Sequence, residues 1–485
     1  MSLGLKPYPA CRDSGVEWLG KVPQHWDVLP FKRVAWFKSG AGFPVSEQGK
    51  AGSDIPFLRV SDMTRTGNDR WIETSDSTVT MEMARQLGAF VFPANTIIFP
   101  KVGGALLTNK RRLLRKASCI DNNVMGCVVG DANLQFMFVV LQQLDLGRLA
   151  KPGPVPAIGE GDVREIAVAV PPIPEQAAIV QYLAYHDRRI RRYIRAKQKL
   201  IALLDEQRKA VIQHAITLGL NPNVRLKPSG VEWLGEVPAH WSVPRIKTVC
   251  RVDTGHTPSR KVAAYWEDCT IPWFTLADVH QLRGDRRKYV FETSECVSEL
   301  GIANSSARRL PAGTVILSRT ASVGFSGILD RDMATSQDFM AWVPGPSVVG
   351  EFLLYVLRAM RPEFRRLMHG STHNTIYMPT LHAFRMPLPP RDEQSALVRH
   401  LDEATSTLDS AIDTASRETE LIEAYRITLV ADVVTGKVDV RDAAAHLPNE
   451  IDEELALDDI ESLVEDEESG EGPSETPLEE VGDEP

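Results

Sequence analysis

The sequence repeats itself once over most of its length, and this repeat limits the possible folds more than any other feature. Segment 14–26, SGVEWLGKVPQHW, returns at 229–241 as SGVEWLGEVPAHW, identical at 11 of 13 positions. A second motif, Pro-Pro-x-x-Glu-Gln, occupies 171–176 and returns at 389–394. The chain is therefore two copies of one unit of about 215 residues. Two copies exclude a solenoid, which needs at least three stacked units.

A long helical pattern begins at each Pro-Pro-x-x-Glu-Gln motif. Eleven positions at alternating spacings of three and four residues form a seam in each copy, and eight of the eleven are apolar in both copies. A sustained heptad at the same phase predicts two long helices, at 173–222 and 389–437, that pack against each other. The seam residues expected to join the helices or to meet a partner are Val180, Leu183, Ile190, Ile194, Ile201, Leu204, Leu401, Leu408, Ile412, Ile422 and Leu429.

The segments before the two helices have a different pattern. Short β-rich runs, such as 96–99 and 315–317, are separated by turn residues and by a few helical stretches. Each segment predicts an α+β globule, one within 1–172 and one within 223–388. The simplest arrangement of two like globules and two like helices has a pseudo-twofold axis. The predicted fold class is therefore α+β, with two similar globules separated by two long antiparallel coiled-coil helices.

The formal net charge of −9 conceals two regions of opposite sign. Residues 447–485 contain 17 Asp or Glu and no Lys or Arg, so residues 1–446 carry 55 basic against 64 − 17 = 47 acidic side chains, a balance of +8. We expect an acidic, disordered tail over 438–485. A basic body permits nucleic-acid binding without establishing it.

No run of residues approaches the roughly 18 apolar positions that span a bilayer, so no membrane location is expected. The six cysteines are scattered without any Cys-x-x-Cys spacing, and they are interpreted as structural or incidental. These features favour a cytoplasmic protein with free thiols and no zinc site.

The sequence also lacks the motifs of the enzymes that act on DNA. It contains no Gly-x-x-x-x-Gly-Lys-Ser/Thr phosphate loop and no Asn-Pro-Pro-Tyr or Asp-Pro-Pro-Tyr. No lysine has an acidic residue two positions before it, so a nuclease Glu-x-Lys or Asp-x-Lys pair is missing as well. The chain is therefore expected to bind and not to catalyse, with no catalytic residues and no metal ligands of its own.

The doubled Gly-Val-Glu-Trp-Leu-Gly-x-Val-Pro-x-His-Trp, the doubled Pro-Pro-x-x-Glu-Gln and the variable globule before each helix resemble the specificity subunit of type I restriction-modification systems. The resemblance covers about residues 7–437. It implies that each globule is a target-recognition domain for one half of a split double-stranded DNA sequence. The acidic tail departs from the family pattern.

The resemblance also implies partners. Two methyltransferase subunits would dock on the antiparallel helices, and restriction-translocase subunits would join that core. S-adenosylmethionine, ATP and Mg²⁺ are then expected on those partner subunits, and no cofactor on this chain.

Reading a DNA sequence requires Arg or Lys for guanine, Asn or Gln for adenine, and basic residues for phosphates. Basic and polar residues that follow a predicted strand in each globule are the candidates, and the places after 96–99 and 315–317 correspond. The candidate DNA-binding residues are Lys101, Asn109, Lys110, Arg111, Arg112, Arg115, Arg319, Thr320, Ser322 and Gln337. A solvated surface explains any single one of them about equally well.

Other conspicuous residues have simpler explanations. The basic cluster 283–288 has no counterpart in the first copy and is a weaker DNA candidate. The repeated Trp18-Leu19 and Trp233-Leu234, with His25-Trp26 and His240-Trp241, are expected to be packing anchors that tie each globule to a helix end. Metal binding by His25 and His240 is not expected, because no other ligand accompanies either histidine.

Two other functions compete with DNA reading. One is a coiled-coil scaffold whose two globules bind protein or glycan. The other is a self-contained restriction-methylation enzyme, which the missing motifs disfavour.

Overall fold

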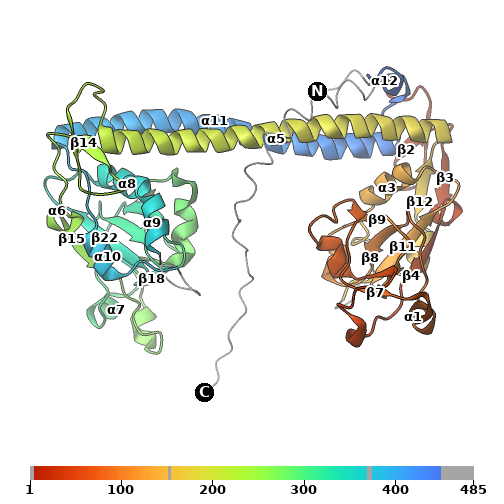
Figure 1. Ribbon diagram of the computed structural model, residues 1–485, viewed down its shortest axis with the longest axis horizontal. Coiled ribbons are helices and arrows are strands. Elements are labelled where there is room, and N and C mark those ends of the chain that lie inside the picture. The colour runs from red at the N-terminus through yellow and green to blue at the C-terminus, as the bar shows by residue number, and fades with distance from the viewer. Residues whose placement is uncertain (1–4, 151–154, 369–373, 449–485) are drawn as a thin grey trace. The chain divides into compact units, whose positions relative to one another are not determined.

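The computed structural model describes residues 5–150, 155–368 and 374–448. The chain divides into two compact units, and each holds one globule with one segment of each long helix (Figure 1). Unit 1 comprises residues 1–193 and 421–485, and unit 2 comprises residues 194–420.

The globule of unit 1 contains twelve described strands and four described α-helices. In chain order these are β1 Cys11–Asp13, β2 Lys21–Pro23, β3 Asp27–Pro30, β4 Ala35–Ser39, β5 Ile55–Leu58, β6 Trp71–Ile72, β7 Thr78–Val79, α1 Met81–Gln86, β8 Ile97–Pro100, α2 Gly104–Leu107, β9 Arg112–Leu114, β10 Cys119–Ile120, β11 Val124–Val129, α3 Leu134–Gln143, α4 Glu160–Arg164 and β12 Ala167–Val170.

The globule of unit 2 contains ten described strands and five described α-helices. In chain order these are β13 Leu226–Pro228, β14 Glu236–Pro238, α6 Ile246–Val249, β15 Cys250–Thr254, β16 Ile271–Phe274, β17 Tyr289–Val290, β18 Glu295–Val297, α7 Glu299–Ala303, β19 Val315–Ser318, β20 Ser326–Leu329, β21 Ala334–Thr335, β22 Phe339–Pro344, α8 Gly350–Ala359, α9 Arg361–Leu367 and α10 Met378–Ala383.

The two globules share one sheet topology, although their sequences differ in the middle. Each has a five-stranded sheet, ordered β4-β11-β8-β9-β6 in unit 1 and β15-β22-β19-β20-β17 in unit 2. Each also has a three-stranded sheet, β10-β5-β7 in unit 1 and β21-β16-β18 in unit 2. The internal repeat therefore extends through the whole globule, which confirms the predicted α+β pair.

The two long helices are the longest elements of the chain. Helix α5 covers Ile173–Leu218 and helix α11 covers Arg391–Val434. In unit 2 an ion pair of 2.6 Å joins Lys197 to Glu418, and one of 3.1 Å joins Arg208 to Asp409. Because the partner number falls as the α5 number rises, the segments are antiparallel, as predicted.

The predicted seam lies on the shielded side of both helices. Leu183, Ile190, Leu401, Ile412 and Leu429 are buried. The other six seam residues are half-buried, namely Val180, Ile194, Ile201, Leu204, Leu408 and Ile422. The predicted heptad therefore identifies correctly which face of each helix is shielded from solvent.

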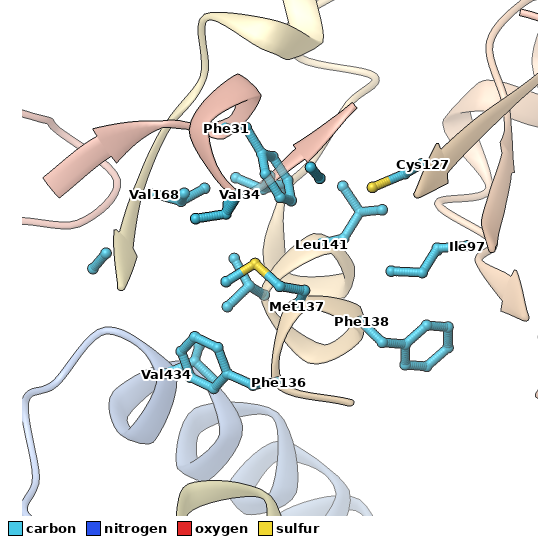
Figure 2. Packing of buried hydrophobic residues seen from close by; sticks show 14 of the residues in the cluster. Phe31, Val34, Ile97, Cys127, Phe136, Met137, Phe138, Leu141, Val168 and Val434 are labelled. Carbon is cyan, nitrogen blue, oxygen red and sulfur yellow. The ribbon is translucent and has the colours of Figure 1, made fainter. Parts of the chain in front are cut away.

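A continuous apolar core joins the globule of unit 1 to its helices. Phe136 and Met137 on α3 are fully buried, and Val434 at the end of α11 lies beside Phe136 (Figure 2). Phe31 and Val168 contribute to the same core from the segment after β3 and from β12. The end of α11 is thus packed into the unit 1 globule by apolar burial.

The repeated motifs meet at the start of each helix. In unit 1 the buried Glu175 carboxylate accepts hydrogen bonds from Tyr8 Oη at 2.6 Å and Trp26 Nε1 at 3.0 Å, and His25 Nε2 lies 2.8 Å from it. In unit 2, His240 Nε2 lies 2.9 Å from the Glu393 carboxylate. The His-Trp pairs are therefore anchors, as predicted: the motif glutamate bonds both residues in unit 1 but only the histidine in unit 2, where Trp241 is held by burial.

The glutamine of each Pro-Pro-x-x-Glu-Gln motif also makes an equivalent contact in the two units. Gln176 Oε1 accepts a hydrogen bond from the Asn133 backbone N–H at 2.8 Å, and Gln394 Oε1 accepts one from the Val349 N–H at 2.8 Å. Asn133 and Val349 are the N-cap residues of α3 and α8. Each long helix thus fixes the first turn of a globule helix, where backbone N–H groups lack partners within the helix.

Part of the predicted tail is folded. Residues 441–445 form helix α12, Arg441–Ala445, and Val440 and Ala444 are buried. Lys6 pairs with Asp439 in an antiparallel bridge, and the Arg441 guanidinium lies 5.1 Å from the Tyr8 ring. These contacts exclude disorder for 438–448, whereas 449–485 lies outside the described residues.

The described part of the chain contains no helix with the length and apolar character required to cross a membrane.

Candidate nucleic-acid interface

In unit 2, three loops meet at the end of β19 through backbone hydrogen bonds. The Arg319 N–H donates to the Asp338 carbonyl at 2.8 Å, and the Arg319 carbonyl accepts from the Ile376 N–H at 2.9 Å. The Ala321 N–H donates to the Asn374 carbonyl at 2.9 Å. The loop after β19 is therefore held on both sides, with Arg319 at its centre.

Unit 1 repeats this pattern at the end of β8. The Lys101 N–H donates to the Asn123 carbonyl at 2.9 Å, and the Lys101 carbonyl accepts from the Ile158 N–H at 2.9 Å. The Gly103 N–H donates to the Pro156 carbonyl at 2.8 Å. Lys101 and Arg319 thus occupy equivalent positions, which agrees with the correspondence expected from the sequence.

A further loop packs its backbone directly against each site. A Cβ atom on Gly255 would lie 2.0 Å from the Thr335 carbonyl oxygen, and one on Gly40 would lie 2.0 Å from the Ile120 carbonyl oxygen. Real Cβ atoms do not approach that closely, so only glycine allows this contact. These glycines were not predicted from the sequence, although Gly40 and Gly255 directly follow the equivalent strands β4 and β15.

The most prominent part of each site is a short turn whose middle residue is exposed. In unit 1 the Asp121 carboxylate accepts from the Asn123 N–H at 3.0 Å, which leaves Asn122 at the apex. In unit 2 the Ser336 hydroxyl accepts from the Asp338 N–H at 3.4 Å. Gln337 is the exposed apex there. Asn122 was not predicted, and aligning the two copies at 121–123 and 336–338 would have found it.

One cation accompanies each apex turn, because its backbone N–H is bonded to the third residue of that turn. Lys101 Nζ donates to Ser39 Oγ at 2.9 Å in unit 1. In unit 2, Arg319 Nε donates to the Gln337 carbonyl at 3.0 Å, and Thr257 Oγ1 donates to Gln337 Oε1 at 2.6 Å. Both sites therefore present a carboxamide beside a positive charge.

The turn of unit 1 also contains a buried acid. Asp121 is 8% exposed, and burial raises the pKa of its carboxyl group, against the opposing effect of the hydrogen bonds from Asn123. The acid is covered, so the surface beside Lys101 carries mainly the amide groups of the turn.

Thr320 and Ser322, two other predicted residues, belong to the unit 2 site. Thr320 pairs with Thr375 in an antiparallel bridge, and Ser322 is half-buried after Ala321, whose φ is 56°. The structure therefore brings Arg319, Thr320, Ser322 and Gln337 together.

Arg111 has a structural role, and its prediction as a DNA-binding residue is wrong. Its side chain is 2% exposed and donates to the Leu144 carbonyl at 3.0 Å and to Asn109 Oδ1 at 2.9 Å. Burial lowers the pKa of the guanidinium to about 10. The side chain enters the core because the residue immediately precedes β9, where inward and outward positions alternate.

The remaining basic residues of unit 1 are not part of the Lys101 site. Strand β9 is antiparallel to β8, with Arg112 opposite Ile98, so the chain runs away from Lys101 as it reaches Arg115. Arg115 is exposed and pairs with Glu73 at 2.7 Å. Arg112 and Arg115 therefore lie towards the opposite end of β8 from Lys101.

Asn109 and Lys110 precede β9 on the connection from α2. Asn109 has a left-handed backbone with φ of 56°, and Lys110 is half-buried. The Asn109 side chain is engaged with Arg111, so its role in DNA binding stays a prediction without geometric support.

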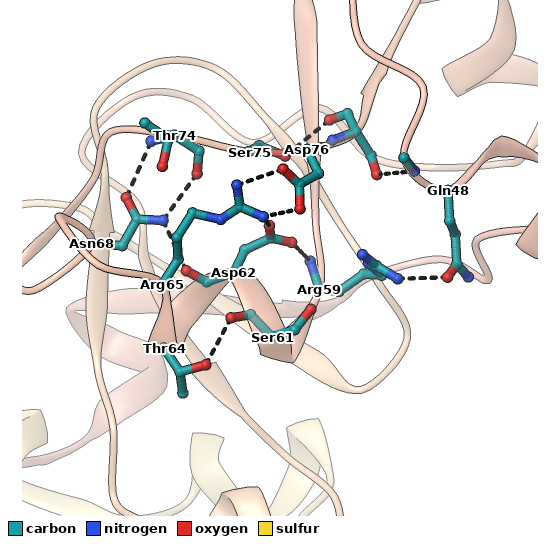
Figure 3. Close-up of polar contacts among 12 residues, drawn as sticks. Gln48, Arg59, Ser61, Asp62, Thr64, Arg65, Asn68, Thr74, Ser75 and Asp76 are labelled. Atoms are coloured by element: carbon teal, nitrogen blue, oxygen red, sulfur yellow. Dashed lines mark hydrogen bonds and ion pairs between the residues drawn. The ribbon is translucent and has the colours of Figure 1, made fainter. Parts of the chain in front are cut away.

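A polar network stabilises a long loop beside the small sheet of unit 1 (Figure 3). The fully buried Asn68 donates to the carbonyl groups of Asp62 at 2.8 Å and Thr74 at 2.9 Å. Arg65 forms an ion pair with Asp76. These bonds join the loop to the segment that follows β6.

Across 5–150, 155–368 and 374–448, no three His, Cys, Asp or Glu side chains converge in the way that a metal site requires. The expectation that this chain binds no metal stays a prediction.

Comparison with known proteins gives a consistent picture. Residues 238–443 match the family model described as the type I restriction modification DNA specificity domain. The MjaIX specificity subunit of a type I restriction enzyme from Methanocaldococcus jannaschii is 29% identical over 198 residues, 40% of this chain and 44% of the relative. The MjaVIII specificity subunit from the same organism is 23% identical over 300 residues, 59% of this chain and 65% of the relative.

The fold has a counterpart among solved structures. A chain from the study described as "Structural basis underlying complex assembly and conformational transition of the type I R-M system" aligns with a TM-score of 0.64 at 17% identity, over 85% of this chain and 98% of that chain. The alignments with the two curated relatives cover less than two thirds of each relative's length. The match of residues 238–443 and the partial alignments show that the chain is similar to specificity subunits of type I restriction-modification systems, and the solved structure shows that it shares their fold.

Proposed function

We propose that this chain is a non-catalytic DNA-specificity subunit of a type I restriction-modification complex, in which each globule reads one half of a bipartite DNA target. The observation that carries the proposal is the duplicated three-loop site. Two equivalent cations, Lys101 and Arg319, stand beside two equivalent exposed amides on the same backbone frame. A cation beside an amide supplies both phosphate attraction and base-edge hydrogen bonds.

The partners in this proposal are double-stranded DNA, two methyltransferase subunits on the helices and restriction subunits on that core. Leu203 on α5 and Leu421 on α11 are 218 residues apart, at equivalent places in the two copies, and are 53% and 64% exposed. This exposed apolar side chain, which recurs at an equivalent place in each copy, is the proposed contact for one methyltransferase subunit per copy. S-adenosylmethionine, ATP and Mg²⁺ would be bound by the partners, and the complex would work in the cytoplasm.

DNA affinity of the complex with its methyltransferase tests the DNA part of the proposal. We expect specific binding to weaken as salt rises, because cations released from the phosphates oppose binding at higher salt. Lys101→Ala and Arg319→Ala should each cost about 1–3 kcal/mol of binding free energy if the residue pairs with a base. Lys32→Ala, at an exposed ion pair with Glu165, is the matched control and should change little.

A domain exchange tests whether each globule reads one half of the DNA target. Replacing residues 30–170 by the corresponding globule of a related subunit should change one half of the methylated motif and keep the other half. A change in both halves would contradict the proposal that the two globules read DNA independently. Binding of protein or glycan, without binding of DNA, would favour the scaffold function.

The helix surfaces need a separate test. Leu203→Asp and Leu421→Asp should each weaken methyltransferase binding, measured by titration calorimetry. Unchanged binding by the double variant would place the partner elsewhere.

A further inference from the structure

The two apex turns are built alike, although few of their side chains match. In each turn the first residue caps the backbone N–H of the third residue, through Asp121 in unit 1 and Ser336 in unit 2. The third residue then accepts from the backbone of Lys101 or Arg319. Because both flanking residues are fixed, the middle residue projects outward.

Both middle residues are carboxamides, and both are exposed. A carboxamide places one donor and one acceptor in a plane, which matches the N7 acceptor and the N6 amino donor of adenine in the major groove. The side chains differ by one methylene, so the match is one of chemistry at an equivalent position.

The surroundings of the two amides differ, and this difference affects the conformational freedom of their side chains. Thr257 Oγ1 donates to Gln337 Oε1 at 2.6 Å, which occupies one acceptor site of that oxygen and leaves the second free. The Gln337 backbone is held as well, since its carbonyl accepts from Arg319 Nε. No side-chain hydrogen bond of Asn122 is present among the described residues.

We propose that Asn122 and Gln337 each read one adenine, one in each half of the DNA target, and that Thr257 is a positioning residue for Gln337. This inference rests on the proposed DNA-reading function. Each site then has an amide side chain that contacts one base and, beside it, a cation that contributes a charged interaction. Gln337 should discriminate more sharply than Asn122, because less side-chain freedom is lost when it binds.

The test uses the full chain in complex with its methyltransferase, with methylation mapping and competition binding on DNA duplexes changed at one base pair at a time. Gln337→Ala should reduce discrimination at one A·T pair of one half-site by about 5- to 150-fold. Asn122→Ala should do the same at one A·T pair of the other half-site. Gln86→Ala on α1 and Asn304→Ala after α7 are exposed amide controls that should leave the motif unchanged.

Carboxylate variants keep the side-chain shape and give a second readout. Glu and Asp accept from the N4 amino group of cytosine, so Gln337→Glu and Asn122→Asp should move the preferred base at the affected position from adenine to cytosine. Thr257→Val should lower discrimination at the Gln337 position several-fold without changing the preferred base.

The outcomes separate this inference from the proposed function. If the wild-type complex binds a specific motif and all apex variants keep that motif, the adenine assignment is overturned and the proposed function stands. Relaxation at a G·C pair would overturn the assignment as well. If the wild-type complex binds no preferred sequence at all, the proposed function itself fails.

Discussion

The loop between β5 and β6 in unit 1 and the loop between β16 and β17 in unit 2 occupy equivalent places in the two globules, yet different contacts hold them. The unit 1 loop is held around the buried amide of Asn68, which bonds to Asp62 within the loop and to Thr74 just after β6, and by the pair between Arg65 and Asp76 (Figure 3). Both loops begin alike, since Asp62 and Asp278 each accept from the backbone three residues earlier.

The unit 2 loop is joined to other elements by charge. Arg361 donates twice to the Asp285 carboxylate, both at 2.6 Å, and Arg358 Nε lies 3.7 Å from it. The buried Arg208 on α5 donates to the Asp285 carbonyl at 3.0 Å. Arg286 and Lys288 pair with Asp413 and Asp402 on α11.

The same loop position is therefore stabilised by different sets of contacts in the two globules. The basic cluster 283–288, a weaker DNA candidate in the sequence, engages helix acids through Arg286 and Lys288. Unit 2 therefore has a buried acid–arginine cluster at a place where unit 1 has a buried amide and an ion pair at the surface.

Neutralising Asp285 should have the largest effect and should be confined to unit 2. Asp285→Asn keeps the side-chain size and the left-handed backbone, with φ of 59°, but leaves buried arginines without their counter-charge. Such a loss costs about 3–5 kcal/mol. Hydrogen exchange should accelerate across 276–290 and stay unchanged across 59–76, and equal acceleration in both loops would contradict the comparison.

The motif glutamates should show the opposite asymmetry. Glu175 is 5% exposed and serves Tyr8, His25 and Trp26, whereas Glu393 is 33% exposed and faces His240. We expect Glu175→Ala to cost about 2–4 kcal/mol of unfolding free energy and Glu393→Ala about 1 kcal/mol. Denaturant unfolding followed by tryptophan fluorescence measures both, and Glu175→Gln, which keeps an acceptor, is the control.

Acid should act on the two globules with opposite sign. Burial opposes ionisation of Asp285, but the hydrogen bond and charge of Arg361 outweigh it and hold its pKa below the ordinary 3.8. Its stabilisation is therefore present above about pH 3.8 and is lost as pH falls through the lowered pKa.

Asp121 has a raised pKa because of burial, so its ionised form weakens the folded state. That penalty is absent below the ordinary pKa and grows as pH rises towards the raised value. Hydrogen-exchange protection factors, which correct for the intrinsic pH dependence of exchange, should thus fall at 276–290 from pH 5 down to pH 3 and should not fall at 121–123. Parallel behaviour of the two segments would show that neither carboxyl group governs its loop.

The smallest effect is expected from the surface pair Arg286 and Asp413, whose side chains are 44% and 52% exposed. Exposed ion pairs contribute about 0–1 kcal/mol and are screened by salt. A double-mutant cycle with Arg286→Ala and Asp413→Ala should give a coupling energy in that range. A coupling near the Asp285 effect would mean that the surface pairs, and not the buried acid, hold the loop.

Periodicity and repetition in the sequence predicted much of this fold. The heptad placed the seam correctly because helix geometry brings every third and fourth residue to one side. The His-Trp anchors were predicted from repetition, while their partner Glu175 was not, since it lies about 150 residues away and only the folded chain brings it close.

The site was harder to predict, because composition does not reveal burial. Arg111 stands in a run of basic residues that looks like a surface loop, yet the following strand turns it into the core. Asn122 carries no charge and lies in a short turn, so a search for basic residues passes over it. The correspondence of Lys101 and Arg319 was visible because each follows the same β-rich run.

The three-loop frame of each site is made from main-chain hydrogen bonds, and this has an evolutionary consequence. The bonds of Lys101 and Arg319 to the neighbouring loops use N–H and carbonyl groups, which every residue except proline provides in full. Side chains at these positions have accordingly diverged between the two copies without altering the bonds. As long as the two glycines and the capping side chains stay in place, such a frame allows the apex residues to mutate one at a time while the protein stays folded, so new recognition properties can arise by drift without compensating changes in the scaffold.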